Sequence, residues 1–130
     1  MKKFIILVML ALSFIGCEPE YCYNYSILNI SQNNVELLFY GEEDSQILLE
    51  NDKQIVQSSF CDDRGDKSYF EYYLIDSVQI KVNSIVKKTY YPNDTGKSIF
   101  KTQDSNSWKL VESREHYSKF VFEITEEDLQ

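Results

Sequence analysis

Short segments in which apolar and polar residues alternate recur through most of the chain. The clearest are residues 35–40, 78–82 and 119–124, in which every second side chain is apolar. A period of two is typical of a strand with one buried face and one face in water. Beyond the N-terminal region, no segment of useful length has the 3.6-residue period of a helix. The pattern therefore predicts an all-β domain.

Clusters of Asn, Asp, Ser, Gly and Pro separate these segments and mark the turns between them. The dipeptides Asn51-Asp52 and Asn83-Ser84 each predict a hairpin between the segments on either side. Residues 69–75 are dense in aromatic side chains and suit either a strand or an irregular packed segment. We predict strands at 23–30, 35–40, 46–50, 53–60, 78–82, 85–91, 108–113 and 119–124, with a short extended piece at 98–101.

The expected fold is an antiparallel β-sandwich of about seven or eight strands, Ig-like or transthyretin-like, because short strands must bury their apolar faces against each other. A small β-barrel is the alternative. The C-terminal residues break the strand pattern, since Thr125 is followed three positions later by Asp128, as in a capping box. We expect a short helical turn there.

The first residues have the layout of a secretory signal. Lys2 and Lys3 precede an apolar run from Phe4 to Leu12. The run is too short for a membrane-spanning helix, which needs about 20 residues. We predict that residues 1–16 are a signal peptide with a helical apolar segment, removed in the mature protein.

The junction Gly16-Cys17 is similar to the lipobox of bacterial lipoproteins. This resemblance implies that the thiol of Cys17 is lipidated and that Cys17 becomes the mature N-terminus; an ordinary secretory signal is the alternative. Residues 17–22 would then form a lipidated acidic tether, and residues 23–130 the β-sandwich domain. Glu18 and Glu20 in the tether resemble the surface-export signal of Bacteroidota lipoproteins, with a solvated linker as the other interpretation.

The other two cysteines, Cys22 and Cys61, form an even pair. In an oxidising compartment the default for such a pair is a disulfide. The closed loop of about 40 residues would stabilise the fold by at most roughly 4 kcal/mol. Two buried free thiols are the alternative.

The charge of the chain is strongly negative. The formal net charge is −8. Removal of residues 1–16 takes away Lys2 and Lys3 and no acid, which makes the mature protein still more acidic. Such a chain repels nucleic acid, so we exclude DNA and RNA as partners. It would attract cationic partners.

Residues that could carry catalysis are few. His116 is the sole histidine, there is no G-x-S-x-G motif, and no set of zinc ligands is visible. The acidic clusters at 42–44 and 62–66, the second of which contains Arg64-Gly65-Asp66, suit solvated turns. We predict a protein that is not an enzyme, with no catalytic residues, no metal site and no cofactor.

Two features point to carbohydrate. The tripeptide Asp76-Ser77-Val78 is similar to the Bacteroidota O-glycosylation site, so Ser77 is a candidate for modification. Nine of the ten tyrosines, all except Tyr40, could form a sugar-binding platform together with Trp108. Their alternative role is structural, because tyrosine is favoured in half-buried strands.

The chain as a whole resembles small Bacteroidota outer-membrane or surface lipoproteins of unknown function, through Gly16-Cys17 and the segments 25–30, 76–82 and 120–129. The resemblance implies a lipid-anchored domain at the outer membrane, either periplasmic or surface-exposed. Its partners would be the membrane, through the lipid, and an unidentified protein or glycan. The alternative function is an acidic inhibitor or immunity-type lipoprotein that blocks a cationic envelope enzyme.

Overall fold

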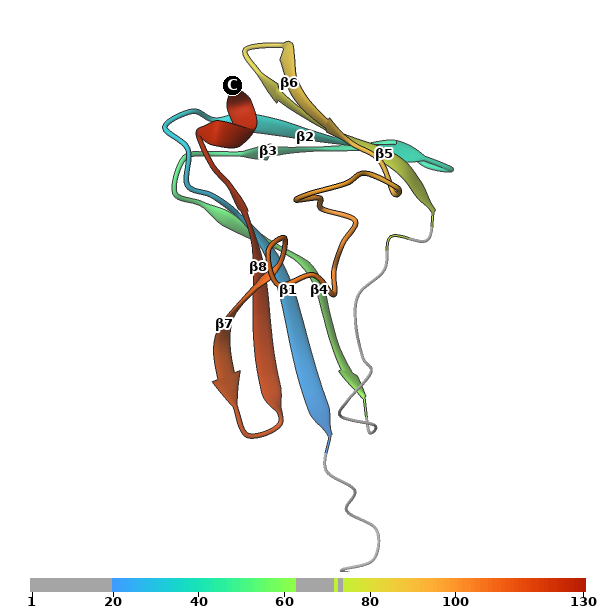
Figure 1. The fold of residues 1–130 in the computed structure, drawn as a ribbon, viewed down its shortest axis with the longest axis vertical. Helices are drawn as coiled ribbons and strands as arrows, with labels where there is room; N and C mark the ends of the chain where they lie inside the picture. The colour runs from blue at the N-terminus through green and yellow to red at the C-terminus, as the bar shows by residue number, and fades with distance from the viewer. Residues whose placement is uncertain (1–19, 63–71, 73) are drawn as a thin grey trace, which may run out of the picture.

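The computed structural model describes residues 20–62, 72 and 74–130 (Figure 1). The predicted signal peptide at 1–16, Cys17, most of the acidic tether, the loop at 63–67 and most of the aromatic segment at 69–75 lie outside the described residues. The elements are β1 (Tyr21–Asn29), β2 (Val35–Gly41), β3 (Ser45–Leu49), β4 (Gln54–Asp62), β5 (Ile75–Val82), β6 (Ile85–Tyr90), β7 (Lys109–Arg114), β8 (Tyr117–Ile124) and the 3-10 helix η1 (Glu127–Leu129).

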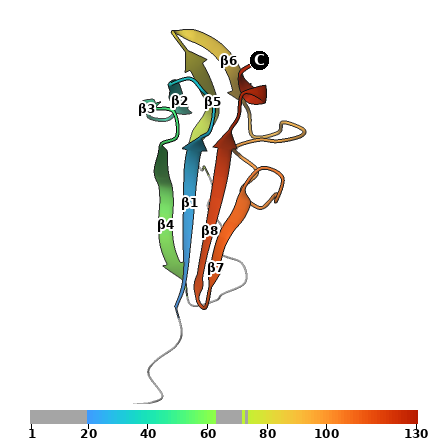
Figure 2. The same ribbon diagram turned by 90° about the vertical axis from the view of Figure 1, so that its left-hand side faces the viewer.

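The strands form two four-stranded sheets, with the orders β4-β1-β8-β7 and β3-β2-β5-β6. The predicted β-sandwich is therefore confirmed. All neighbouring strands are antiparallel except β1 and β8, which pair in parallel. Figure 1 shows β2 and β3 running across the direction of β1 and β8. Figure 2 shows the strands β4, β1, β8 and β7 side by side.

The predicted hairpin around Asn51-Asp52 is wrong, although both of its strands exist. β3 pairs with β2, whereas β4 pairs with β1 in the other sheet. The Asp52 N–H donates to the Asn29 carbonyl at 2.8 Å, and the Asn29 side-chain amide donates to the Leu49 carbonyl at 3.0 Å. These bonds fasten the turn to the end of β1, so the turn carries the chain from one sheet to the other.

The hairpin around Asn83-Ser84 is confirmed. Val82 and Ile85 face each other across a two-residue turn. Asn83 and Ser84 both have positive φ angles, 50° and 66°. Two positive φ angles are what a type I′ turn requires, and its twist matches that of the flanking strands.

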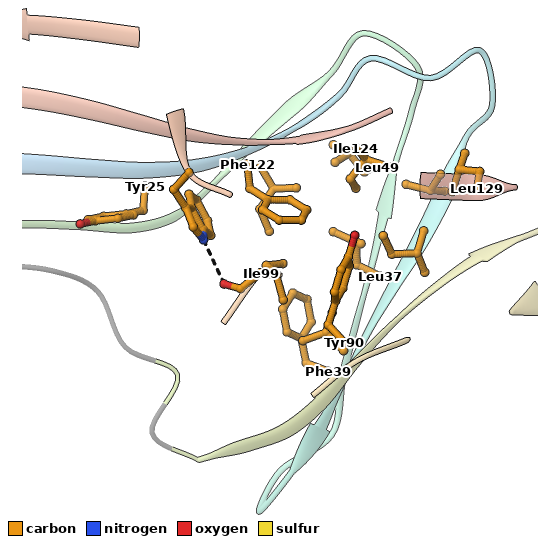
Figure 3. Packing of buried hydrophobic residues seen from close by; sticks show 14 of the residues in the cluster. Tyr25, Leu37, Phe39, Leu49, Tyr90, Ile99, Phe122, Ile124 and Leu129 are labelled. Carbon is orange, nitrogen blue, oxygen red and sulfur yellow. Dashed lines mark hydrogen bonds between the residues drawn. The ribbon is translucent and has the colours of Figure 1, made fainter. Parts of the chain in front are cut away.

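The long connection between β6 and β7 helps to form the core. Ile99 is fully buried and Trp108 is 1% exposed. The Trp108 indole N–H donates to the Ile99 carbonyl at 3.0 Å, shown by the dashed line in Figure 3. The Trp108 ring lies 5.4 Å from that of Tyr25 and 5.6 Å from that of Phe122. Because β6 and β7 are edge strands of different sheets, the connection packs where the sandwich would otherwise be open.

The extended piece predicted at 98–101 is wrong, because these residues form a turn. The Lys101 N–H donates to the Ser98 carbonyl at 3.1 Å, and the Phe100 N–H donates to the Ser98 hydroxyl at 3.3 Å. A serine that bonds the backbone two residues later favours a turn over a strand.

The C-terminal helical turn is confirmed. The Thr125 N–H and hydroxyl both donate to the Asp128 carboxylate, at 2.8 and 2.9 Å, immediately before and within η1. Leu129 is buried against the core. Within residues 20–62, 72 and 74–130, no helix has the length and hydrophobicity needed to cross a bilayer.

Candidate functional site

The disulfide between Cys22 and Cys61 is present. The two residues face each other on β1 and β4, with their Cα atoms 4.0 Å apart. They are 39 positions apart in the sequence. The bond therefore joins the start of β1 to the end of β4.

Ser77 lies on β5 with a half-buried side chain. It pairs with Tyr40 of β2, and its neighbour Asp76 is exposed. Val78 is fully buried, so the alternation along the strand puts Ser77 on the outer face of the sheet. Glycosylation of Ser77 stays a prediction.

His116 lies in the two-residue turn between β7 and β8 and has a positive φ of 60°. Its ring meets the edge of Tyr21 at 4.7 Å, and its carbonyl accepts the Cys22 N–H at 2.8 Å. In the part of the chain that the structure describes, no three His, Cys, Asp or Glu residues gather as metal ligands would. The Arg64-Gly65-Asp66 tripeptide lies outside the described residues.

Four of the aromatic residues considered for a sugar-binding platform are packed inside the protein. Tyr25, Tyr90 and Trp108 are each 1% exposed, and Tyr23 is 8% exposed. Rings at this depth cannot present a face to a sugar. The burial of these four residues supports a structural role for them.

A pocket of about 460 Å³ lies where the C-terminal turn meets the edge strands of the two sheets. No pattern in the sequence predicts it. Its walls come from β6, the β6–β7 connection, β7, β8 and the C-terminal turn. It is lined by Lys88, Lys97, Asn106, Ser107, Lys109, Glu123, Thr125, Glu127, Asp128 and Gln130.

Lys97 is fixed at this pocket by three contacts. Its ammonium group donates to the Asp128 carboxylate at 2.7 Å and to the Glu123 carbonyl at 2.5 Å. It also lies 4.9 Å from the centre of the Phe122 ring, within cation–π distance. The Lys97–Asp128 ion pair is mostly shielded from solvent, with side-chain exposures of 29% and 12%. It joins the β6–β7 connection to the C-terminal turn.

The surroundings of Asp128 act on its pKa in opposite directions. Burial raises the pKa, but the hydrogen bonds from Lys97 and Thr125, together with the Lys97 charge, hold it below the ordinary value. The Tyr90 hydroxyl also faces this carboxylate; burial, followed by the Asp128 charge, raises the pKa of Tyr90. Asp128 is thus ionised and Tyr90 neutral at physiological pH.

We expect Asp128→Asn to lower the free energy of unfolding by about 1–2 kcal/mol near neutral pH, because charge-assisted hydrogen bonds are lost. The folded pKa lies below the unfolded pKa, so the stabilisation is present above the unfolded pKa and is lost as the pH falls through the folded value. Urea denaturation at neutral pH and below about pH 4 checks this, since the difference between variant and wild type should shrink in acid. The control is Glu127→Gln, which leaves the ion pair intact. An undiminished difference in acid would contradict the assignment.

No family model, curated protein or solved structure matches the chain at a significant level. Its function is therefore inferred from its own residues. The pocket could not be predicted from the sequence because its lining comes from four separate stretches: residue 88, residue 97, 106–109 and 123–130. No sequence motif links Lys88, Lys109 and Glu123, for example. They line one pocket only because the fold brings β6, β7 and β8 close together there.

Proposed function

We propose that this protein is a lipid-anchored, non-enzymatic module of the bacterial outer membrane that binds a protein or glycan partner. The lipid on Cys17 would hold the domain at the envelope, and its loops and strand edges would contact the partner. The short sequence from Lys2 to Cys17 supports the anchor, through its charged start, apolar run and Gly-Cys junction.

The observation that carries this proposal is the disulfide between Cys22 and Cys61. Stable disulfides are typical of exported proteins and rare in the cytosol. The bond also lies five residues after Cys17 in the sequence, so force on the anchor would pass into two paired strands of the sandwich and not into a free end.

A second candidate function is inhibition of a cationic envelope enzyme. The observation that favours it is a second pocket of about 430 Å³, lined by Glu42, Glu43, Asp44, Ser45, Leu74 and Ile75. Three carboxylates beside an exposed leucine suit a basic side chain of a partner. Binding of this kind should weaken steeply as salt is raised, because the attraction is between exposed charges.

We expect Cys17→Ser to release the protein from the membrane fraction, because the acyl chains that bind the bilayer cannot be attached. Fractionation of cells followed by intact-mass measurement of the protein checks this. The control is the double variant Glu18→Gln and Glu20→Gln, which keeps the thiol and should stay with the membranes. Retention of Cys17→Ser in the membrane fraction would rule out the lipid anchor.

A further inference from the structure

The pocket beside the C-terminal turn is electrically balanced, unlike the acidic chain around it. Three of the ten lining residues are lysines and three are carboxylates: Lys88, Lys97 and Lys109 against Glu123, Glu127 and Asp128. The other four lining side chains are neutral and polar. A bound anion would face the carboxylates and a bound cation would face the lysines, so neither sign of net charge is favoured.

Four charges of the pocket are already paired with each other. Lys97 binds Asp128 at 2.7 Å, and Lys109 binds Glu123 at 3.1 Å. The hydroxyl of Ser107 accepts from the Ser98 N–H at 3.0 Å, which holds the wall formed by the β6–β7 connection. These bonds set the shape of the pocket before any ligand arrives, as an effective binding site requires.

Four other lining residues are exposed and form what we call the rim of the pocket: Lys88, Asn106, Glu127 and Gln130. Among the described residues, neither the ammonium group of Lys88 nor the carboxylate of Glu127 has an ion-pair partner. In the same part of the structure, the side-chain amides of Asn106 and Gln130 form no hydrogen bond within the protein. The rim therefore offers a strong donor, a strong acceptor and two groups that can both donate and accept.

Building on the proposed role as an envelope binding protein, we propose that this pocket binds a neutral saccharide. Sugar hydroxyls donate and accept hydrogen bonds at once, so they can meet ammonium, carboxylate and amide groups together without adding net charge. The pocket volume of about 460 Å³ falls within the range of small-molecule sites, roughly 300–1,000 Å³. This mode of binding needs no exposed aromatic ring.

The strand β6 supplies a matched pair of lysines for a test. Lys88 shares its side of the strand with buried Tyr90, and its ammonium group lies 5.5 Å from the centre of that ring. Lys87 is exposed and does not line the pocket. Lys87→Ala therefore removes a charge at almost the same place without touching the pocket.

The test is a titration of the detergent-solubilised full-length protein with a panel of neutral mono- and disaccharides, followed through backbone amide NMR signals. We expect saturable shifts at Asn106, Ser107 and Glu127 for at least one neutral sugar. Lys88→Ala and Glu127→Gln should each weaken its binding roughly tenfold, the effect of losing one charge-assisted hydrogen bond. Lys87→Ala should leave the dissociation constant unchanged, as should a rise in salt, because the ligand is uncharged.

The amino-sugar and uronic-acid counterparts of the bound sugar should bind more weakly than the neutral form. Tighter binding of either charged form, equal weakening by Lys87→Ala, or no shift at the pocket with any sugar would overturn the proposal. These outcomes do not depend on the anchor, because the protein is already solubilised. Failure of the lipid assignment would instead appear as membrane retention of Cys17→Ser, whatever the pocket binds.

Discussion

Trp108→Ala is expected to lower the free energy of unfolding by about 3–5 kcal/mol, which is the cost of removing a large buried aromatic side chain. Trp108 is 1% exposed and packs against Tyr25 and Phe122, one from each of two neighbouring strands. Removal of the indole would leave a cavity, and the carbonyl of Ile99 would lose the N–H group that donates to it. Denaturation by urea, followed by far-ultraviolet circular dichroism, measures the effect without using tryptophan fluorescence.

Two further variants separate the causes of this loss. Trp108→Phe keeps a ring in the core but leaves the buried Ile99 carbonyl without its donor, so we expect a smaller loss of about 1–3 kcal/mol. Tyr91→Ala changes a side chain of the same connection that is 54% exposed, and its effect should stay within about 0.5 kcal/mol. A Trp108→Ala protein as stable as Tyr91→Ala would show that the connection does not close the core.

Removal of the disulfide by the double variant Cys22→Ser and Cys61→Ser is expected to lower the free energy of unfolding by about 2–5 kcal/mol. The bond joins residues 39 positions apart, so it restricts a long loop in the unfolded chain. Denaturant titration of the variant beside the wild type, both without reductant, checks this prediction.

Treatment of the wild type with a reductant provides the matched control, since the reduced wild type should be about as stable as the double variant. Either single variant should also match the double, because one remaining thiol cannot close the bond. Free-thiol labelling of both Cys22 and Cys61 in the native oxidised protein would contradict the disulfide. An unchanged unfolding midpoint in the double variant would contradict the expected loss of stability.

The strands could be predicted from the sequence because burial of one face imposes a period of two on each of them, whatever they pair with. Pairing depends instead on distant contacts. Asn51-Asp52 looks like a hairpin turn, but the bonds to Asn29 that make it a crossing between sheets come from residues more than one strand away. The parallel pairing of β1 with β8 leaves no local signal either, because the two strands are far apart in the sequence, one being the first and the other the last strand described.

The candidate site shows the same division between local and distant information. Thr125 and Asp128 are three positions apart, so their capping contact could be predicted from spacing alone. Lys97 reaches Asp128 from 31 positions away, through a connection whose path is set by the burial of Ile99 and Trp108. A separation of 31 positions in the sequence does not predict whether two side chains are close in space, so the pocket could be recognised only in the structure.

The position of β1 between β4 and β8 has a consequence for how the protein reaches its native state. β1 is synthesised before the other seven described strands, yet its neighbours β4 and β8 come from the middle and from the last part of the sequence. Contacts over such long separations form slowly, because a large loop must close first. Until β8 has arrived, one edge of β1 is open to other chains, so a chaperone that shields it would improve the yield of folded protein.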